Sequence, residues 1–480
     1  MTRSQRNRSA RYLFFAAAAL SLLMFSIDST VVAVAIPAIT RDLGTSLVWV
    51  GWTLTAYSLV QTVVMPVAGR LGESFGLLRL FFLSVVLFTV GSMLCGLAPN
   101  IYLLILARVV QALGGGGFLP LSAAIVSREF PESRQQMIGL FSSIFPLGGI
   151  IGPNLGGLIL QFISWREIFL VNVPIGIFIL VVLRRLWRPE PRKPQRIDVA
   201  GALTFAGAIF SLLAALTAVG DNPRLVTSPV FWVPVGLAAV LLGIFWVHEH
   251  RVEDPLVDPA LVGRPPFLTV NVYNLMFGAC VFSFFSFVPY YAVVQFGMSP
   301  VESGAILTPR SLVMSVTATL VSLFLLRLGY RLPMALGIGL ISLSLFLVGR
   351  GWSEVSLDGL RLGAFGLLAL QMGLAGLGMG LAAPAANNAV LDLMPERAGA
   401  ITGLRGMFRS TGGILGTAVV VLILDLVPDR AAGLRAIFTG AAALLAGLVL
   451  PLVFLIPDSA RERRRAGRAE PVPTPAPHDD

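Results

Sequence analysis

The sequence predicts an all-α integral membrane protein with fourteen transmembrane helices, arranged as two six-helix pseudo-symmetric bundles and two inserted helices. Three observations predict this class. Of the 480 residues, 56% are hydrophobic and 12% are charged, whereas charged residues make up about 25% of a soluble domain. Apolar runs long enough to cross a bilayer recur along the whole chain. A glycine- and proline-rich pattern repeats at one fixed separation, which indicates duplicated halves.

The apolar runs fall into three groups along the chain. The first six runs cover 12–37, 47–68, 78–98, 101–126, 137–162 and 167–184. Two further runs, 198–219 and 229–247, follow the basic, proline-rich stretch at 184–196. The last six runs cover 267–294, 303–326, 332–349, 359–386, 398–424 and 434–456. A membrane span needs about 20 apolar residues, so each run is expected to cross once.

The internal repeat divides these runs into halves. The segment "GGGGFLP" ends at Pro120 and "GMGLAAP" ends at Pro384, while "GGIIG" begins at Gly148 and "GGILG" at Gly412. Both pairs are separated by 264 residues (384 − 120 and 412 − 148). The shared offset indicates that the last six runs are a parallel copy of the first six, an organisation typical of transporters that bind substrate between their halves.

These divisions and the distribution of arginine predict the domains and the topology. We expect an N-terminal tail at 1–11, a first bundle at 12–184, a linker at 185–197, inserted helices at 198–247, a second linker at 248–266, a second bundle at 267–456 and a disordered tail at 457–480. Arginines concentrate in alternate gaps, on the side of the N-terminal tail. The positive-inside rule therefore predicts a multi-pass protein of the inner or plasma membrane with both termini in the cytoplasm.

The composition excludes several classes of protein. The net charge is +10, but the basic residues lie between apolar runs and set topology, so no nucleic-acid partner is expected. Lys193 follows no glycine loop, which excludes a Walker motif and an ATP-driven pump. Cys95 and Cys280 are isolated, and the histidines form no convincing ligand set. We therefore predict no metal, no cofactor and no enzymatic activity.

Two charged residues lie inside apolar runs of the first bundle. Asp28 lies deep in the first run, where an isolated charge costs about 3 kcal/mol or more, so it is a candidate functional group. The alternative is a structural carboxylate that is capped by Ser29 or Thr30 or faces water. Arg108 lies in the fourth run with Gln111 one turn further on. Arg108 either holds helices together in an ion pair or modulates the proton affinity of a carboxylate.

The segment "GGIIGPNLGG" (148–157) places small residues on one side of a helix. Two rows recur at a spacing of four: Gly148, Gly152 and Gly156 in one row, and Gly149, Pro153 and Gly157 in the other. The rows are adjacent on a helix, so they predict a groove that another helix, the tenth run, approaches closely. Pro153 leaves the carbonyl of Gly149 without its helical donor, which predicts a bend around 149–153.

Several segments together resemble the fourteen-span drug:proton antiporter branch of the major facilitator superfamily. They are "IDSTVVAVAIP" (27–37), "WTLTAY" (52–57), "ARVVQALGGG" (107–116), "GGIIGPNLGG" (148–157), "SWREIFLVNVPIG" (164–176) and "FRSTGGILGTA" (408–418). The resemblance covers almost the whole chain. It implies that Asp28 and Arg108 couple proton and substrate movement, and that the segment 148–157 is an antiporter motif at the contact between the halves.

The loop after the second run departs from the family pattern. In "GRLGESFGLLR" (69–79), Gly69 and Gly76 are kept, Glu73 replaces an aspartate, and Arg79 is displaced. The family uses this loop as a cytoplasmic charge latch. The resemblance therefore implies a gate loop here, either with a weaker latch or with Glu73 paired to Arg79 or to another arginine.

The resemblance and the buried charges lead to one functional prediction. We expect a monomeric secondary transporter that exports amphipathic drugs or toxic small molecules, cationic or neutral, in exchange for protons by alternating access. Possible substrate contacts are Trp52, Tyr57, Gln111, Arg310 and Arg409. Export of one specific metabolite or lipid is the alternative. A channel is a third possibility, although the repeated halves favour a carrier.

Overall fold

The structure, a computed structural model, is almost entirely helical. It describes residues 3–133, 137, 140–141, 144–187, 198–253, 255, 257, 259, 265–357, 360–391 and 398–456. Within these residues, fourteen helices are long and apolar enough to cross a membrane. The predicted all-α class with fourteen spans is thereby confirmed, and the chain is a multi-pass membrane protein.

In the described residues, the six spans of the first bundle are built from seven α-helices. They are α1 (Arg3–Asp42), α2 (Leu47–Phe75), α3 (Leu77–Gly96), α4 (Ile101–Glu129), α6 (Ile144–Phe162), α7 (Glu167–Leu170) and α8 (Asn172–Arg185). A one-residue turn at Gly76 separates α2 from α3, with φ +101°, a conformation that glycine adopts without strain. The side chain of Asn100 caps α4 by accepting a hydrogen bond from the Leu103 amide.

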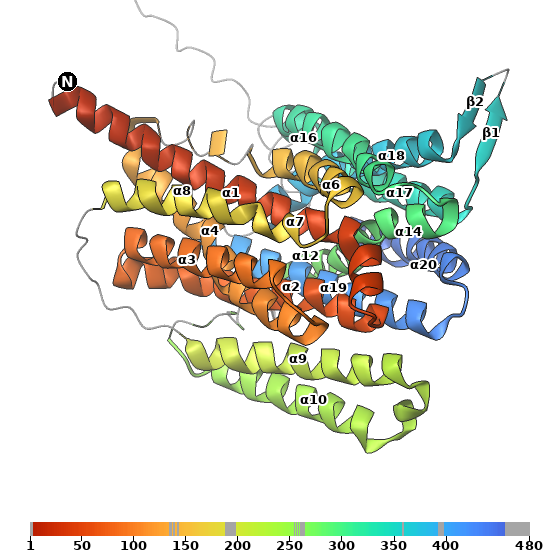
Figure 1. Cartoon of the computed structure of the whole chain (residues 1–480). Helices are drawn as coiled ribbons and strands as arrows, with labels where there is room; N and C mark the ends of the chain where they lie inside the picture. The colour runs from red at the N-terminus through yellow and green to blue at the C-terminus, as the bar shows by residue number, and fades with distance from the viewer. Residues whose placement is uncertain are drawn as a thin grey trace, which may run out of the picture.

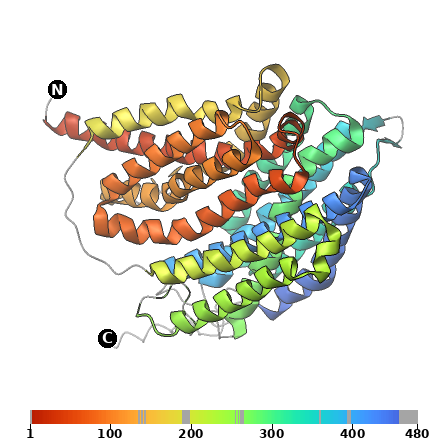
Figure 2. The same cartoon turned by 60° about the horizontal axis from the view of Figure 1, so that its bottom comes forward.

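The inserted helices α9 (Val199–Asp221) and α10 (Pro229–Glu249) form a pair along one side of the molecule. Figure 2 shows the pair lying beside the blue C-terminal helices. α9 packs against α2 and α19, and thus contacts both bundles. Only 11% of the most apolar window of α10 is buried, which is expected of a helix that faces lipid.

The second bundle is more interrupted than the first. Its elements are α12 (Pro265–Phe277), η3 (Gly278–Phe282), α13 (Ser283–Ser286), α14 (Val288–Phe296), α15 (Pro300–Ala305), α16 (Thr308–Leu328), α17 (Arg331–Gly349), β1 (Glu354–Leu357), β2 (Leu360–Gly363), α18 (Ala364–Leu391), α19 (Ala398–Leu426), α20 (Arg430–Leu444), η5 (Leu445–Val449) and α21 (Leu450–Leu455). Both η3 and η5 are short π-helical segments. The run predicted to begin at 359 therefore starts as a strand, because residues 360–363 pair with β1 in an antiparallel hairpin.

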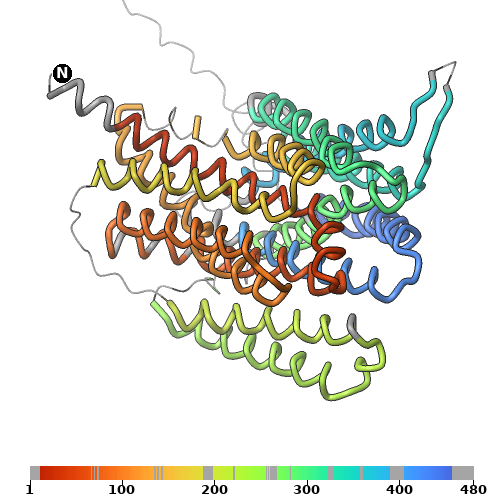
Figure 3. Tube along the Cα trace, viewed as in Figure 1, coloured from red at the N-terminus to blue at the C-terminus, as the bar shows by residue number. Residues whose placement is uncertain are grey.

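Successive spans cross in opposite directions, so their ends gather on two opposite faces of the molecule. We call the side where α1 begins the terminus face, and the side that carries the β1–β2 hairpin the hairpin face (Figure 1). In Figure 3, drawn from the same side, α1 extends towards the left and the β1–β2 hairpin lies at the right. The first bundle lies mainly to the left of the second in these views, and the two meet where α6 passes α15 and α16.

Equivalent glycines of the repeat pack in the same way in both bundles. A Cβ on Gly148 or Gly152 of α6 would collide with α1, and a Cβ on Gly412 of α19 would collide with backbone of α12 and η3. In each bundle, therefore, the fifth span lies against the first span at backbone distance, as small residues in membrane helices allow.

Candidate functional site

The acidic centre of the site is Asp28, midway along α1, which is 0% exposed. Its Oδ2 accepts a hydrogen bond from Nη1 of Arg108 at 2.7 Å, and its Oδ1 accepts one from Nε2 of Gln111 at 2.8 Å. Arg108 and Gln111 are three residues apart on α4, a spacing that places them on one helix face. The predicted alternative, a cap from Ser29 or Thr30, does not form, because both hydroxyls donate to backbone carbonyls of α1 instead.

The guanidinium of Arg108 is 1% exposed and is bonded on several sides. Its Nη1 also donates to Oε1 of Gln111 at 2.6 Å, and its Nε donates to the Thr53 carbonyl of α2 at 3.1 Å. Its Cζ lies 3.8 Å from the ring centroid of Tyr57. A buried ion pair is tolerated when its remaining donors are satisfied in this way, and removing one partner costs about 3–5 kcal/mol.

A second polar layer surrounds the ion pair. The hydroxyl of Ser92 on α3 accepts hydrogen bonds from Gln111 Nε2 at 3.1 Å and from Asn172 Nδ2 at 3.0 Å. The amide of Asn172 on α8 also lies 3.5 Å from Asp28 Oδ1. Our sequence reasoning missed both residues. The signal that could have identified Asn172 was its amide within the apolar segment 164–176, which carries part of the family resemblance.

The first glycine row lies inside the first bundle. Gly148, Gly152 and Gly156 face Ser26, Thr30 and Val31 of α1, respectively. The Ser26 hydroxyl donates to the Phe145 carbonyl at 2.6 Å. This row therefore fixes α6 against α1, the helix that carries Asp28.

The second row faces the other bundle. Gly157 meets the backbone of Pro300 and Val301, while the carbonyl of Pro153 lies against Gly304. The Gly149 carbonyl, which lacks a helical donor because of Pro153, accepts a hydrogen bond from the Ser311 hydroxyl of α16 at 3.1 Å. Asn154 Nδ2 donates to Thr308 Oγ1 at 2.6 Å. The expected tenth span thus occupies this side, but the two rows have different partners rather than one.

The gate loop is only partly described. Gly69 lies near the end of α2, Gly76 forms the turn, and Arg79 lies in the first turn of α3. The side chain of Glu73 lies outside the described residues. The predicted latch between Glu73 and an arginine therefore stays a prediction.

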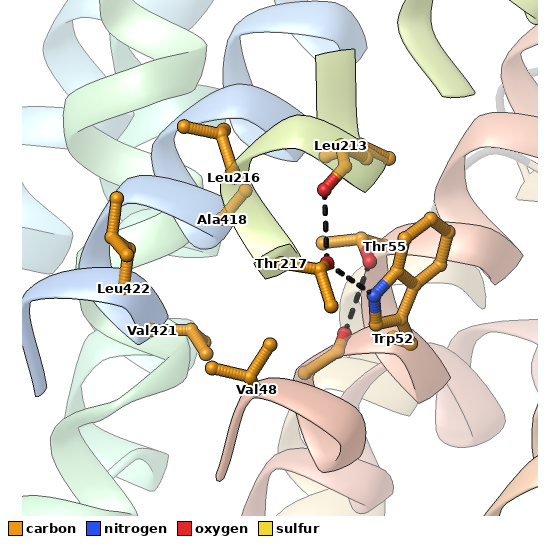
Figure 4. A pocket seen from close by; sticks show the side chains of 10 residues that line it. Val48, Trp52, Thr55, Leu213, Leu216, Thr217, Ala418, Val421 and Leu422 are labelled. Atoms are coloured by element: carbon orange, nitrogen blue, oxygen red, sulfur yellow. Dashed lines mark hydrogen bonds between the residues drawn. The ribbon is translucent and has the colours of Figure 1, made fainter. Parts of the chain in front are cut away.

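Trp52 contributes to a small cavity of about 20 Å³ between α2, α9 and α19. Its Nε1 donates to Thr217 Oγ1 of α9 at 2.7 Å, as Figure 4 shows. The rest of the lining is mainly aliphatic, with Val48, Leu216 and Val421 turned towards the same space. A cavity of this size holds about one water molecule, so it does not accommodate a drug-sized compound.

The other predicted substrate contacts lie in different surroundings. Tyr57 and Gln111 are buried in the Asp28 network. Arg310, on α16, lies over Phe285 with its Cζ 5.7 Å from the ring centroid. Arg409 lies on α19, where its carbonyl faces Gly278. Across the described residues, no three His, Cys, Asp or Glu side chains gather as a metal site would require.

Comparison with known proteins identifies the family. The model of the Major Facilitator Superfamily matches residues 18–417 and 275–478. The tetracenomycin C resistance and export protein of Streptomyces glaucescens is 32% identical over 86% of this chain and 77% of its own. The multidrug resistance protein B homolog of Mycobacterium tuberculosis is 31% identical over 84% of this chain and 74% of its own. Multidrug transporter protein MdtP of Bacillus subtilis is 29% identical over 87% and 76%, respectively.

Solved structures share the architecture at much lower identity. A POT family transporter crystallised with 5-aminolevulinic acid superposes with a TM-score of 0.68, at 15% identity, over 94% of this chain and 96% of its own. A second POT family structure, with a thioalcohol-conjugated peptide, gives a TM-score of 0.67 at 15% identity over 93% and 96%. These similarities establish the fold alone. Together with the matching family model and the drug-efflux relatives, they show that the chain belongs to the major facilitator superfamily, among its multidrug efflux members.

Proposed function

We propose that this protein exports amphipathic small molecules across the cytoplasmic membrane by proton antiport, acting as a monomer. The observation that carries the proposal is the buried Asp28–Arg108 pair at 2.7 Å. The relatives whose names denote drug resistance or export support the substrate class. The arginine-rich gaps support an orientation with the terminus face in the cytoplasm.

The pair offers a way to couple a proton to a conformational change. A carboxylate that is neutralised by Arg108 needs no proton, whereas a protonated Asp28 leaves Arg108 without its counter-charge. Proton uptake therefore weakens the bond between α1 and α4. Asp28 lies on α1 and Arg108 lies on α4, so a change in protonation alters how these two helices pack. α1 in turn contacts α6 and, in the second bundle, α14.

Contacts between the bundles suggest which side is closed in this conformation. Gly157 meets Pro300 and Gly51 meets Val421, and all four residues lie in the halves of their spans nearest the hairpin face. Ser311 and Thr308 add hydrogen bonds towards the middle of the membrane. We infer that the hairpin face is the external side and that it is sealed here. Alternating access would then require the second glycine row to separate from α15 and α16.

The proton gradient is sufficient to drive such a cycle, since each charge that crosses the membrane contributes about 2.3 kcal/mol per 100 mV. The test is transport by the full chain reconstituted in liposomes with an imposed pH gradient. We expect substrate uptake that saturates and that moves protons in the opposite direction. Channel-like unitary currents, or transport that ignores the pH gradient, would contradict the proposal.

A matched pair of variants addresses the coupling residue. Asp28→Asn should reduce proton-driven transport by about 100-fold or more, because the amide cannot take up and release a proton. Asp42→Asn should leave proton-driven transport unchanged, because Asp42 lies at the end of the same helix, where it accepts hydrogen bonds from Trp165 and Arg166. Full proton-driven export by the Asp28→Asn protein would exclude Asp28 as the coupling group.

A further inference from the structure

Two arginines inside the spans of the second bundle, Arg310 and Arg405, receive little compensation from the side chains around them. Arg310 lies in α16, and Arg405 lies in α19. Acidic residues in the described parts of the last six spans are Glu302 and Asp425. Each lies within two residues of a span end, on the hairpin face, and Glu302 caps α15 together with Ser299. The interior of these spans is therefore strongly positive.

Arg310 is placed too deep to reach either membrane surface. It is the eleventh residue of the span Pro300–Ser322, so about 15 Å of helix separates it from one end and about 18 Å from the other. It is half-buried, and its interaction in the described part of the chain is the ring contact with Phe285. A single ring at 5.7 Å compensates only a small part of the cost of a charge at this depth.

Arg405 adds a second group of unsatisfied donors nearer the terminus face. Its Nε is buried without a hydrogen-bond partner, and the hydroxyl of Tyr273 on α12 is in the same condition. α12 packs against α19, and the charge of Arg405 lies within electrostatic range of Tyr273. Buried donors are nearly always paired in native proteins. Two unpaired donors on packed helices, one of them cationic, form the kind of site that an acceptor oxygen of a ligand completes.

Aromatic surface accompanies both cations. Tyr273 stacks on Phe277 with ring centroids 5.8 Å apart, and Phe285 lies under Arg310. Tyr273 and Phe285 are twelve residues apart along the ninth span, about 18 Å on a helix. Arg405 and Arg310 therefore lie at different depths in the membrane. By contrast, the carboxylate that a cationic substrate would need, Asp28, is already engaged by Arg108.

We propose that the second bundle recognises substrates bearing an anionic oxygen group, a carboxylate or phenolate, attached to an aromatic ring. Arg405 and Tyr273 receive the anion near the terminus face, and Arg310 holds it at mid-membrane. This inference rests on the proposed export function and names its substrate class. It extends the sequence-based expectation of cationic or neutral compounds, because it assigns the proton to the first bundle and the substrate charge to the second.

The test uses radiolabelled 1-naphthoate and 1-naphthamide, which share a ring and differ in charge. Equilibrium binding is measured on the purified full chain at neutral pH, without a proton gradient. We expect wild type to bind the carboxylate at least about 10-fold more tightly than the amide, as charge-assisted hydrogen bonds would give. Arg310→Gln should reduce this ratio to near one. Arg405→Gln and Tyr273→Phe should reduce it by about 3-fold or more.

Two controls keep the result interpretable. Arg350→Gln removes an exposed arginine at the end of α17, whose partner is Phe346, and should leave the ratio unchanged. Arg310→Lys keeps the charge and should retain part of the preference even if Arg310→Gln proves unstable. Equal binding of the two compounds by wild type, absence of binding of both, or an unchanged ratio in Arg310→Gln would overturn the proposal.

Transport measurements separate this inference from the proposed function. If 1-naphthoate binds through Arg310 but is not moved by a pH gradient, the antiport proposal fails and the anion site stands. If the gradient drives export of 1-naphthamide or tetraphenylphosphonium while the carboxylate has no advantage in binding, the anion site fails and antiport stands.

Discussion

The arginines inside the spans of the two bundles have opposite surroundings. In the first bundle, Arg108 has a carboxylate at 2.7 Å, an amide at 2.6 Å, a backbone carbonyl and an aromatic face. In the second bundle, Arg310 has one distant ring, and Arg405 keeps a buried Nε without a partner. Because the fold and the glycine packing are repeated in both bundles, this difference lies in side-chain chemistry and not in architecture. It indicates that the first bundle supplies the counter-charge of its own arginine, whereas under our proposal the substrate supplies that of the second bundle.

The largest expected effect comes from removing Arg108, the counter-charge of Asp28, so that the first bundle also contains a charge without an opposite partner. Arg108→Gln leaves Asp28 buried without its counter-charge, so we expect the free energy of unfolding in detergent to fall by about 3–5 kcal/mol and transport to be lost. The double variant Asp28→Asn with Arg108→Gln should recover most of that stability and none of the transport. Denaturant unfolding and vesicle transport of the same preparations measure both quantities. An Arg108→Gln protein as stable as wild type would show that the pair is not structural.

The shared packing can be tested with equivalent glycines. A Cβ on Gly148 would overlap the Ser26 side chain and meet the Ile27 nitrogen at 3.0 Å, and one on Gly412 would overlap the Leu275 carbonyl and meet the Ala279 nitrogen at 2.9 Å. We therefore expect Gly148→Ala and Gly412→Ala to lower the unfolding free energy by similar amounts, about 1–3 kcal/mol each. Gly339→Ala is the control, since nothing lies within 4 Å of its added Cβ. A large loss in one bundle alone would contradict equivalent packing.

A smaller effect is expected at the contact between the bundles. Ser311→Ala removes the hydrogen bond to the Gly149 carbonyl, worth about 1 kcal/mol, and should shift the equilibrium between conformations about 5-fold away from this one. Ser315→Ala is the control, because its hydroxyl bonds within α16 to the Ser311 carbonyl. Distances between spin labels on the hairpin face of α6 and α15 report the shift. Identical distance distributions for both variants would argue against a moving contact.

The smallest effect is expected where the inserted helices attach. Trp52→Phe removes the hydrogen bond from Trp52 to Thr217 but keeps an aromatic ring, so we expect a loss of about 1 kcal/mol or less and unchanged transport. Thermal unfolding and efflux assays measure the two effects. A selective loss of transport would instead support the sequence-based expectation that Trp52 contacts substrate.

Much of the fold could be predicted because apolar length and glycine spacing are local properties. The fourteen spans, the small-residue surface of α6 and the two buried charges Asp28 and Arg108 all follow from them. Predictions failed where a non-local contact decided the structure. Residues 360–363 read as the start of an apolar run, but pairing with β1 makes them a strand. The two glycine rows read as one groove, but they contact α1 and the second bundle separately.

The sequence by itself determined which segments enter the membrane and which charged side chains enter with them, because the cost of burying charge and backbone in lipid depends on composition and length. Only the tertiary structure decided the partners of those side chains. Asp28 meets Arg108 from 80 positions away and Asn172 from 144 positions away, whereas Arg310 meets no carboxylate in the described spans. Residue spacing fixes the face of a helix on which a group lies. The neighbour of that face is decided when the helices pack, because van der Waals packing and interhelical hydrogen bonds depend on the whole arrangement of spans rather than on any one of them.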